Sequence, residues 1–214
     1  MIAVIVPIYN TEKYLRETID SVICQTLSFA EHIRLILLDD ASTDGSFAIC
    51  EQYQKQYPKQ ILVKHYDTNQ GVSALRNEGV RIAGEMGDEL ITFLDSDDKL
   101  ADDAMEKTVQ YFDAHEDVFV AAIGIRYFDA YEGEQRLNWR FEKTDVVDIK
   151  KDYTYPHYYV GGVFLRHAVL DELHFDESLS FWEDALAVNQ VIVSQGNDVS
   201  AKLQPFFQEI NLTQ

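Results

Sequence analysis

Four short apolar runs alternate with helical patterns over the first hundred residues of this chain. Runs of apolar and β-branched residues without polar alternation are typical of strands covered on both faces. Each run is followed by a segment whose apolar positions recur at helical spacing. Strict alternation of strand and helix predicts an α/β fold, with a Rossmann-like, mostly parallel central sheet and helices on both faces. The expected strands are 2–8, 33–38, 61–65 and 91–94, and the expected helices are 14–23, 47–57, 72–84 and 99–111.

The pattern weakens after Tyr111. We expect one long strand or a strand pair at 118–127, polar irregular structure at 131–151, and a tight turn into a short strand at 161–165. A further helix is expected to begin near Phe181, and 199–210 is strand-like around Pro205. Because 214 residues are enough for one sizeable core, the sequence predicts a single domain, 1–214.

The charge balance excludes one large class of partners. The chain has 37 acidic and 18 basic residues, a formal net charge of -19, whereas nucleic-acid binding requires a basic face. Cys24 and Cys50 have no metal-ligand spacing, so we expect both to be small buried residues with free thiols in a reducing compartment. Residues 1–8 are too short and too uncharged for a signal peptide, which favours a cytoplasmic protein.

The fourth apolar run ends in three carboxylates within four residues, Asp95, Asp97 and Asp98. Ligands of open α/β sheets bind outside the carboxyl ends of the strands. Three ionised carboxylates at close range repel one another, and a divalent cation, Mg²⁺ or Mn²⁺, would relieve this repulsion. Such a cation is usually shared with substrate phosphates. The alternative is a solvated acidic turn that caps the next helix.

Two further groups of polar residues accompany this cluster. Asp39 and Asp40 also end an apolar run, where an acidic residue can accept a hydrogen bond from a nucleobase or a ribose hydroxyl. Arg76 lies on a helix of small and apolar residues and can bridge carboxylates and phosphates, or form a structural ion pair with Asp39 or Asp95. The sequence contains no glycine-rich phosphate loop, which disfavours dehydrogenases and kinases.

Near the end of the chain, Glu183 and Asp184 follow Phe181 and Trp182 at the start of an expected helix. N-capping alone could explain an acidic residue there. Alternatively, an aspartate in a partly apolar cleft is suited to act as a general base, because burial raises its pKa toward neutrality. His157, among tyrosines, is a structural residue or a sugar or metal contact.

Five segments resemble, in sequence order, the motifs of family 2 glycosyltransferases. They are Val4 to Asn10, Asp39 to Ser46, Asn69 to Asn77, Phe93 to Asp98, and Trp182 to Asp184. Each motif is weak alone, but their common order over nearly the whole chain is specific. The resemblance implies a GT-A fold, a nucleotide-diphosphate-sugar donor, a Mn²⁺ or Mg²⁺ cofactor and inversion at the anomeric carbon.

The resemblance also implies roles for individual residues. Asp40 would bind the base, typically uracil, Arg76 would support the acidic cluster, and Asp184 would be the catalytic base. Asp95 and Asp97 would form the family's Asp-x-Asp motif. The positions matching the nucleotide-sugar site are Pro7, Tyr9, Asn10, Asp40, Arg76, Asp95 and Ser96, and the metal ligands would be Asp97, Asp95 and Asp98. Residues 1–110 would form the nucleotide-sugar-binding half of the domain, and 111–214 the acceptor-side half.

The resulting hypothesis is a metal-dependent inverting glycosyltransferase that uses a UDP-sugar and a glycan or lipid-linked acceptor, in bacterial surface-polysaccharide synthesis at the inner face of the cell membrane. Peripheral membrane association, the donor sugar, the acceptor and the oligomeric state stay open. A non-catalytic nucleotide-sugar-binding module and a nucleotidyltransferase are the alternatives, although the latter's basic glycine-rich loop is missing. Relatives commonly continue past the Glu-Asp helix, so we expect a shortened chain or a minimal member.

Overall fold

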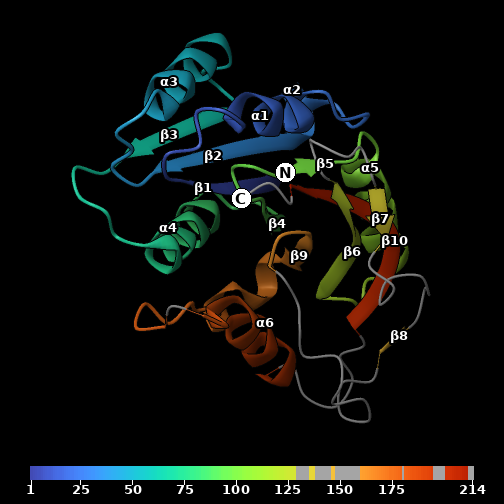
Figure 1. Cartoon of the computed structure of the whole chain (residues 1–214). Coiled ribbons are helices and arrows are strands. Elements are labelled where there is room, and N and C mark those ends of the chain that lie inside the picture. Colours follow the sequence, from blue (N-terminus) through green and yellow to red (C-terminus); the bar gives the residue numbers. More distant parts are fainter. Residues whose placement is uncertain (129–134, 138–145, 148–159, 180, 195–200, 212–214) are drawn as a thin grey trace.

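The computed structural model describes residues 1–128, 135–137, 146–147, 160–179, 181–194 and 201–211 (Figure 1). These residues form one mixed sheet in the order β3-β2-β1-β4-β9-β6-β10-β5, with β7 beside β6 and β8 beside β10. The strands are β1 (Ile2–Ile8), β2 (Ile33–Asp39), β3 (Ile61–His65), β4 (Leu90–Phe93), β5 (Lys99–Leu100), β6 (Val120–Phe128), β7 (Gln135–Leu137), β8 (Val146–Val147), β9 (Val163–Arg166) and β10 (Ala201–Asn211).

Strands β3, β2, β1 and β4 are parallel to one another and form the first half of the sheet. Helices cover both of its faces, with α1, α2 and α3 above the sheet and α4 and α6 below it in Figure 1. The α/β prediction is therefore confirmed. The helices are α1 (Leu15–Ile23), α2 (Phe29–His32), α3 (Ser46–Gln56), α4 (Val72–Glu85), α5 (Ala104–Ala114) and α6 (Glu183–Ser194), with a 3₁₀ helix η2 (His167–Glu172).

The apolar runs divide between two cores because successive side chains of a strand point to opposite faces. In β1, Ala3 and Ile5 pack in the core under α4 and α6, whereas Val4 and Val6 pack in the core under α1, α3 and α5. All seven residues of β1 are buried. This explains why the strand has no polar alternation in the sequence.

Helix α4 approaches the sheet closely at Gly79. A Cβ atom added there would lie 2.3 Å from Cγ2 of Ile5 on β1, well inside contact distance. Glycine thus allows the helix to lie directly on the central strand, and this fixes where the N-terminal turn of α4 meets the strand ends.

The second half of the sheet is mixed. Strand β9 lies antiparallel between β4 and β6, and β10 runs parallel to β6 with a register shift between Gln204 and Phe207. The long strand, the turn into β9, the α6 helix and the strand around Pro205 were all expected. The division into halves at residue 110 stays a prediction.

Several expectations about elements were wrong. Lys99 and Leu100 do not begin a helix but form β5, which pairs with β10, and α5 begins only at Ala104. Parts of the segment expected to be irregular form β7 and β8. For β5 and β8 the partner strand β10 is distant in sequence, whereas β7 pairs with the strand just before it, β6; in each case strand pairing decides the conformation.

Two further observations concern residues singled out in the sequence. Cys24 is exposed rather than buried, because it follows the last turn of α1, while Cys50 is buried as expected. His157 lies outside the described residues. Among the described residues, no helix is both long and apolar enough to cross a membrane.

Candidate functional site

The predicted site residues gather at one edge of the sheet. Because β1, β2 and β4 are parallel, the segments after Ile8, Asp39 and Phe93 leave the sheet at the same edge. Pro7 lies in β1 beyond Ile5, the last residue paired with β4, so its missing N–H is tolerated there. Tyr9 follows, with 52% of its surface exposed.

The loops after β1 and β2 are tied together by reciprocal hydrogen bonds. The N–H of Asn10 donates to Ser42 Oγ at 3.0 Å, and the N–H of Thr43 donates to Asn10 Oδ1 at 2.8 Å. A second reciprocal pair links Glu12 with Asp44 and Gly45 at 3.0 and 2.8 Å. The two loops therefore form one rigid wall of the site.

This wall contains two non-glycine residues in the left-handed region, Asn10 with φ of 54° and Ala41 with φ of 60°. Asparagine tolerates this conformation, whereas alanine adopts it at a cost of about 1 kcal/mol or more. The hydrogen bonds between the loops maintain the strained backbone. Backbone strain of this kind is commonly retained where a ligand is held.

Asp40 is buried, with 3% exposure, and accepts two backbone hydrogen bonds. The N–H of Gln70 donates to Oδ1 at 2.6 Å and that of Gly71 to Oδ2 at 2.9 Å, so Asp40 fixes the turn that leads into α4. Each carboxylate oxygen keeps a second lone pair. The predicted contact with a nucleobase would have to use one of these and stays a prediction.

Asp39 has a different role from its neighbour. Its Oδ2 lies 2.7 Å from Nδ1 of His65 on β3 and accepts a hydrogen bond from the N–H of Ser42 at 3.3 Å. It is fully buried and is not the partner of Arg76, which was one of two alternatives for that arginine.

Arg76 connects three segments that are far apart in the sequence. From α4, its Nη2 donates to Asp95 Oδ1 at 3.2 Å, and its Nη1 donates to Glu183 Oε1 at 3.1 Å. Arg76 is only 4% exposed. One buried guanidinium thus joins the acidic turn after β4 to the first residue of α6, as its fixed fork of donors permits.

Two residues that sequence reasoning did not single out hold this arginine in place. The Phe175 ring centroid lies 5.6 Å from Cζ of Arg76 and 5.2 Å from the Phe93 ring centroid. The backbone of Phe175 is held on both sides by Asn77, whose amide donates to its carbonyl and accepts from its N–H, each at 2.8 Å. Asn77 lies in the segment Asn69 to Asn77, one of the five that resemble the family's motifs, and this resemblance was the sequence feature that pointed to it.

The acidic turn after β4 is half-buried. The N–H of Asp98 donates to the carbonyl of Asp95 at 3.0 Å, and the Ser96 carbonyl accepts from Thr18 Oγ1 at 2.9 Å. Burial, and then the negative charge of Asp95, raise the pKa of Asp97 above its usual value. Both effects oppose ionisation, and a cation at this position would favour it.

These oxygen donors suit a hard cation chemically. Among the described residues, however, no three His, Cys, Asp or Glu side chains converge as a metal-binding group. The structure therefore does not assemble Asp95, Asp97 and Asp98 into one complete ligand set. A cation held by one or two carboxylates together with a substrate diphosphate remains the prediction.

Asp184 lies in the first turn of α6, directly after Glu183. The N–H of Val160 donates to its Oδ2 at 3.4 Å, and the N–H of Ala185 to its Oδ1 at 2.7 Å. Burial is the largest influence on its carboxyl and raises the pKa, although these hydrogen bonds and the charge of Arg76 act in the opposite direction. An aspartate in this environment can act as a general base.

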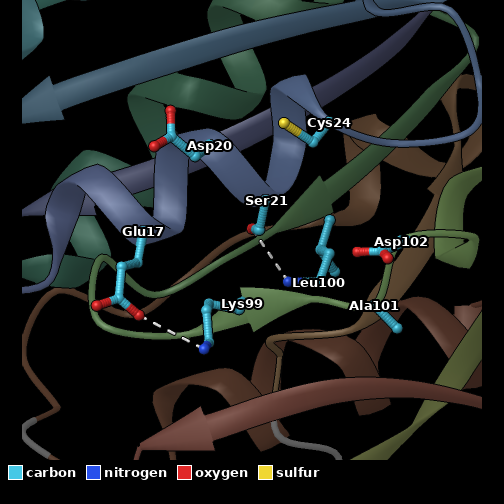
Figure 2. Close-up of a pocket in the computed structure, with 8 residues that line it drawn as sticks. All are labelled: Glu17, Asp20, Ser21, Cys24, Lys99, Leu100, Ala101 and Asp102. Atoms are coloured by element: carbon cyan, nitrogen blue, oxygen red, sulfur yellow. Dashed lines mark hydrogen bonds and ion pairs between the residues drawn. The ribbon is translucent and has the colours of Figure 1, made fainter.

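A separate pocket of about 490 Å³ lies between α1 and β5 (Figure 2). Lys99 Nζ lies 3.5 Å from Glu17 Oε2, and the N–H of Leu100 donates to Ser21 Oγ at 3.2 Å across it. None of the predicted site residues lines this pocket.

Comparisons with known proteins agree on one family. A model described as Glycosyl transferase family 2 matches residues 3–174. The chain is 42% identical over 197 residues to the minor teichoic acid biosynthesis protein GgaA of Bacillus subtilis (strain 168), covering 91% of this chain and 44% of that protein. It is 38% identical over 194 residues to GgaB of the same organism, covering 89% and 21%. This chain thus spans less than half the length of either relative.

The fold is similar to that of a crystal structure of S. aureus TarS 1–349 in complex with UDP-GlcNAc. The TM-score is 0.83 at 23% sequence identity, and the match covers 100% of this chain and 59% of that chain. The GT-A architecture expected from the sequence is therefore confirmed.

Proposed function

The chain belongs to glycosyl transferase family 2, and we propose that it transfers a sugar from a UDP-sugar to a hydroxyl group of a saccharide or lipid-linked saccharide in bacterial cell-wall polymer synthesis. The bridge formed by Arg76 is the observation that carries this proposal. It keeps the acidic turn after β4 and the start of α6 together, so that a donor and a base could act on the same sugar.

Three similar proteins support the choice of substrates. The names of GgaA and GgaB refer to teichoic acid synthesis, and the TarS complex contains UDP-GlcNAc. By analogy we assign a UDP-sugar donor and a cell-wall polymer acceptor to this chain. The proposal includes a cytoplasmic location, at the inner face of the membrane where the acceptor is lipid-linked.

In the proposed reaction the loops after β1 and β2 bind the nucleoside, and Tyr9 and Asp40 contact its nucleobase. Asp184 removes the proton from the acceptor hydroxyl, which attacks the anomeric carbon on the side opposite the diphosphate, and the configuration inverts. Asp97, with Asp95 or Asp98, would hold a divalent cation, which supplies charge neutralisation at the leaving diphosphate. Arg76 keeps Asp95 and Glu183 in position by its two ion pairs.

Calorimetric titration of UDP with and without Mn²⁺ tests the donor half of this proposal. The native chain is expected to bind UDP only with Mn²⁺, and Asp97→Ala is expected to lose this metal-dependent binding, because a half-buried carboxylate is removed from the acidic turn. Asp113→Ala, which removes an exposed carboxylate on α5, is the matched control and should bind like the native chain. UDP binding that is the same with and without Mn²⁺ would contradict the metal assignment.

The alternative is a relative that binds the nucleotide-sugar without transferring it. Asp184 distinguishes the two, because a binding module has no need for a base at that position. Loss of transfer in Asp184→Asn with retained UDP affinity supports the transferase.

A further inference from the structure

The segment that leads into α6 exposes an unusual amount of apolar surface. Phe181 is 80% exposed and Trp182 is 61% exposed, although aromatic side chains contribute most to stability when buried. Leu179 and Leu186 are 37% and 39% exposed. We refer to these four residues as the aromatic patch. Large exposed apolar side chains grouped in one short segment are typical of binding surfaces.

The backbone at Trp182 carries a conformational cost. Its φ is 67°, in the left-handed region that a bulky residue rarely adopts. Its carbonyl accepts the N–H of Leu186 at 2.9 Å, so Trp182 occupies the N-cap of α6, a position that favours small polar residues. Neither helix capping nor packing in the core explains a tryptophan at this position. Backbone strain of about 1–3 kcal/mol, as a left-handed φ causes, is typical of ligand-binding positions.

The patch is continuous with the candidate catalytic residues. Trp182 precedes Glu183, which is bonded to Arg76, and Asp184 follows within the same helical turn. A molecule seated on the patch therefore lies beside the proposed base, on the side of the site provided by α6 rather than by the donor loops.

The charges around the patch define what it can bind. In the sequence, acidic residues flank it on both sides, at Asp176, Glu177, Glu183 and Asp184, and no lysine or arginine lies between His167 and Ala201. Arg76, which contacts Glu183, is only 4% exposed. Carboxylates accept hydrogen bonds from hydroxyl groups but repel phosphates and anionic lipids. A sugar ring has apolar C–H faces and hydroxyl donors around its rim. Aromatic rings surrounded by carboxylates, which accept hydrogen bonds from hydroxyl groups, therefore suit a sugar ring.

We propose that the aromatic patch is the acceptor subsite and binds a neutral saccharide ring of the acceptor, with Trp182 and Phe181 as its stacking residues. This rests on the proposed function and adds the chemical class of the group that occupies the acceptor side. A membrane surface is the competing occupant, and the net charge of -19 together with the lack of lysine and arginine in the sequence from His167 to Ala201 argues against it.

The first test measures transfer kinetics with Trp182→Asn, because asparagine tolerates the left-handed conformation and caps helices well. The acceptor KM is expected to rise about tenfold, a loss that matches the removal of one aromatic contact. UDP affinity should stay within about twofold. Trp182→Tyr should restore most of the acceptor affinity. Met86→Ala is the control for the loss of an exposed apolar side chain, because Met86 lies at the C-terminal end of α4 and not in the aromatic patch.

The second test does not need transfer activity. Trp139→Phe leaves Trp182 as the one tryptophan of the chain, and its fluorescence is followed during titration with N-acetylglucosamine, methyl β-glucoside and phosphatidylglycerol vesicles. A blue shift with a saccharide but not with vesicles supports the subsite, even if UDP binding fails and the proposed function falls. A shift with vesicles alone, no shift with any probe, or an unchanged acceptor KM in Trp182→Asn would overturn the inference.

Discussion

Asp184 lies in an environment that opposes its own ionisation. Burial raises the pKa of its carboxyl, and the hydrogen bonds from Val160 and Ala185 offset only part of this effect. A general base acts in its deprotonated form, so its activity is lost as the pH falls through its pKa. We therefore expect kcat to decline on acidification at a higher pH than an ordinary aspartate would give, which a pH profile of kcat measures directly.

Asp184→Asn separates this role from a structural one, since the amide oxygen can still accept the N–H of Val160. We expect kcat to fall by a factor of about 10² to 10⁴, with the acidic limb of the profile removed and UDP affinity unchanged. A variant that kept both its rate and its acidic limb would show that another group takes the proton.

At the scale of single residues, the sequence predicted which side chains lie together beyond the strand ends better than it predicted their hydrogen-bond partners. The carboxylates after two strands were found from the rule that ligands bind at strand ends, and Arg76 was found from its charge on a helix of small and apolar residues. The choice of Asp95 over Asp39 as partner of Arg76, and the pairing with Glu183, depend on how α4 and α6 pack. Local sequence patterns do not reveal that packing, because Glu183 lies 107 residues from Arg76 and on a different helix.

Helix α4 positions the site through its contact with β1 at Gly79. Gly79→Ala would place a Cβ atom 2.3 Å from Ile5 Cγ2, so either the helix or the strand must shift. We expect a loss of about 1–3 kcal/mol in the free energy of unfolding, measured by urea denaturation. Gly84→Ala in the same helix is the control, because the nearest atom would lie 4.0 Å away and the higher helix propensity of alanine adds up to about 1 kcal/mol.

The pair is informative because propensity alone predicts the same sign for both variants. Equal stabilisation by Gly79→Ala and Gly84→Ala would contradict the close approach of α4 to the sheet. If the approach is real, Gly79→Ala combined with Ile5→Ala should cost less than the sum of the two single substitutions, because Ile5→Ala removes the Cγ2 atom that the added Cβ would meet.

Elements with strong local periodicity were predicted, and elements made by distant pairing were not. Helices α1, α3 and α4 carry their apolar positions at helical spacing and were found within a few residues. Lys99 and Leu100 are a strand only because Gln208 and Glu209 pair with them. The partner strand is more than a hundred residues away, so the local pattern favoured a helix.

The whole molecule carries a formal net charge of -19, and this self-repulsion opposes the compact state. Added salt screens charges over about 8–10 Å. We expect Tm, followed by circular dichroism, to rise by a few degrees between about 10 and 300 mM NaCl. A fall in Tm over this range would mean that local ion pairs outweigh the net repulsion.

The ion pairs that join Glu78 to Lys64 and Arg81 act in the opposite way to the net charge, because they stabilise the fold locally. Hydrogen bonds, first from Arg81, lower the pKa of Glu78 to about 2. Its stabilising contribution is therefore complete above about pH 4.5 and is lost as the pH falls toward 2. Glu78→Gln should lose this local contribution while keeping the rise of Tm with salt, which separates the two effects.

The Arg76 bridge also has a consequence for the order in which the protein is made. Its two carboxylate partners leave the ribosome at very different times, since Asp95 follows Arg76 by 19 residues and Glu183 follows it by 107. Contacts of such long range form late in folding because their loop must first be closed. The nascent chain can therefore assemble the nucleotide-binding loops early, but it acquires the base on α6 and closes the guanidinium bridge only after α6 has been synthesised.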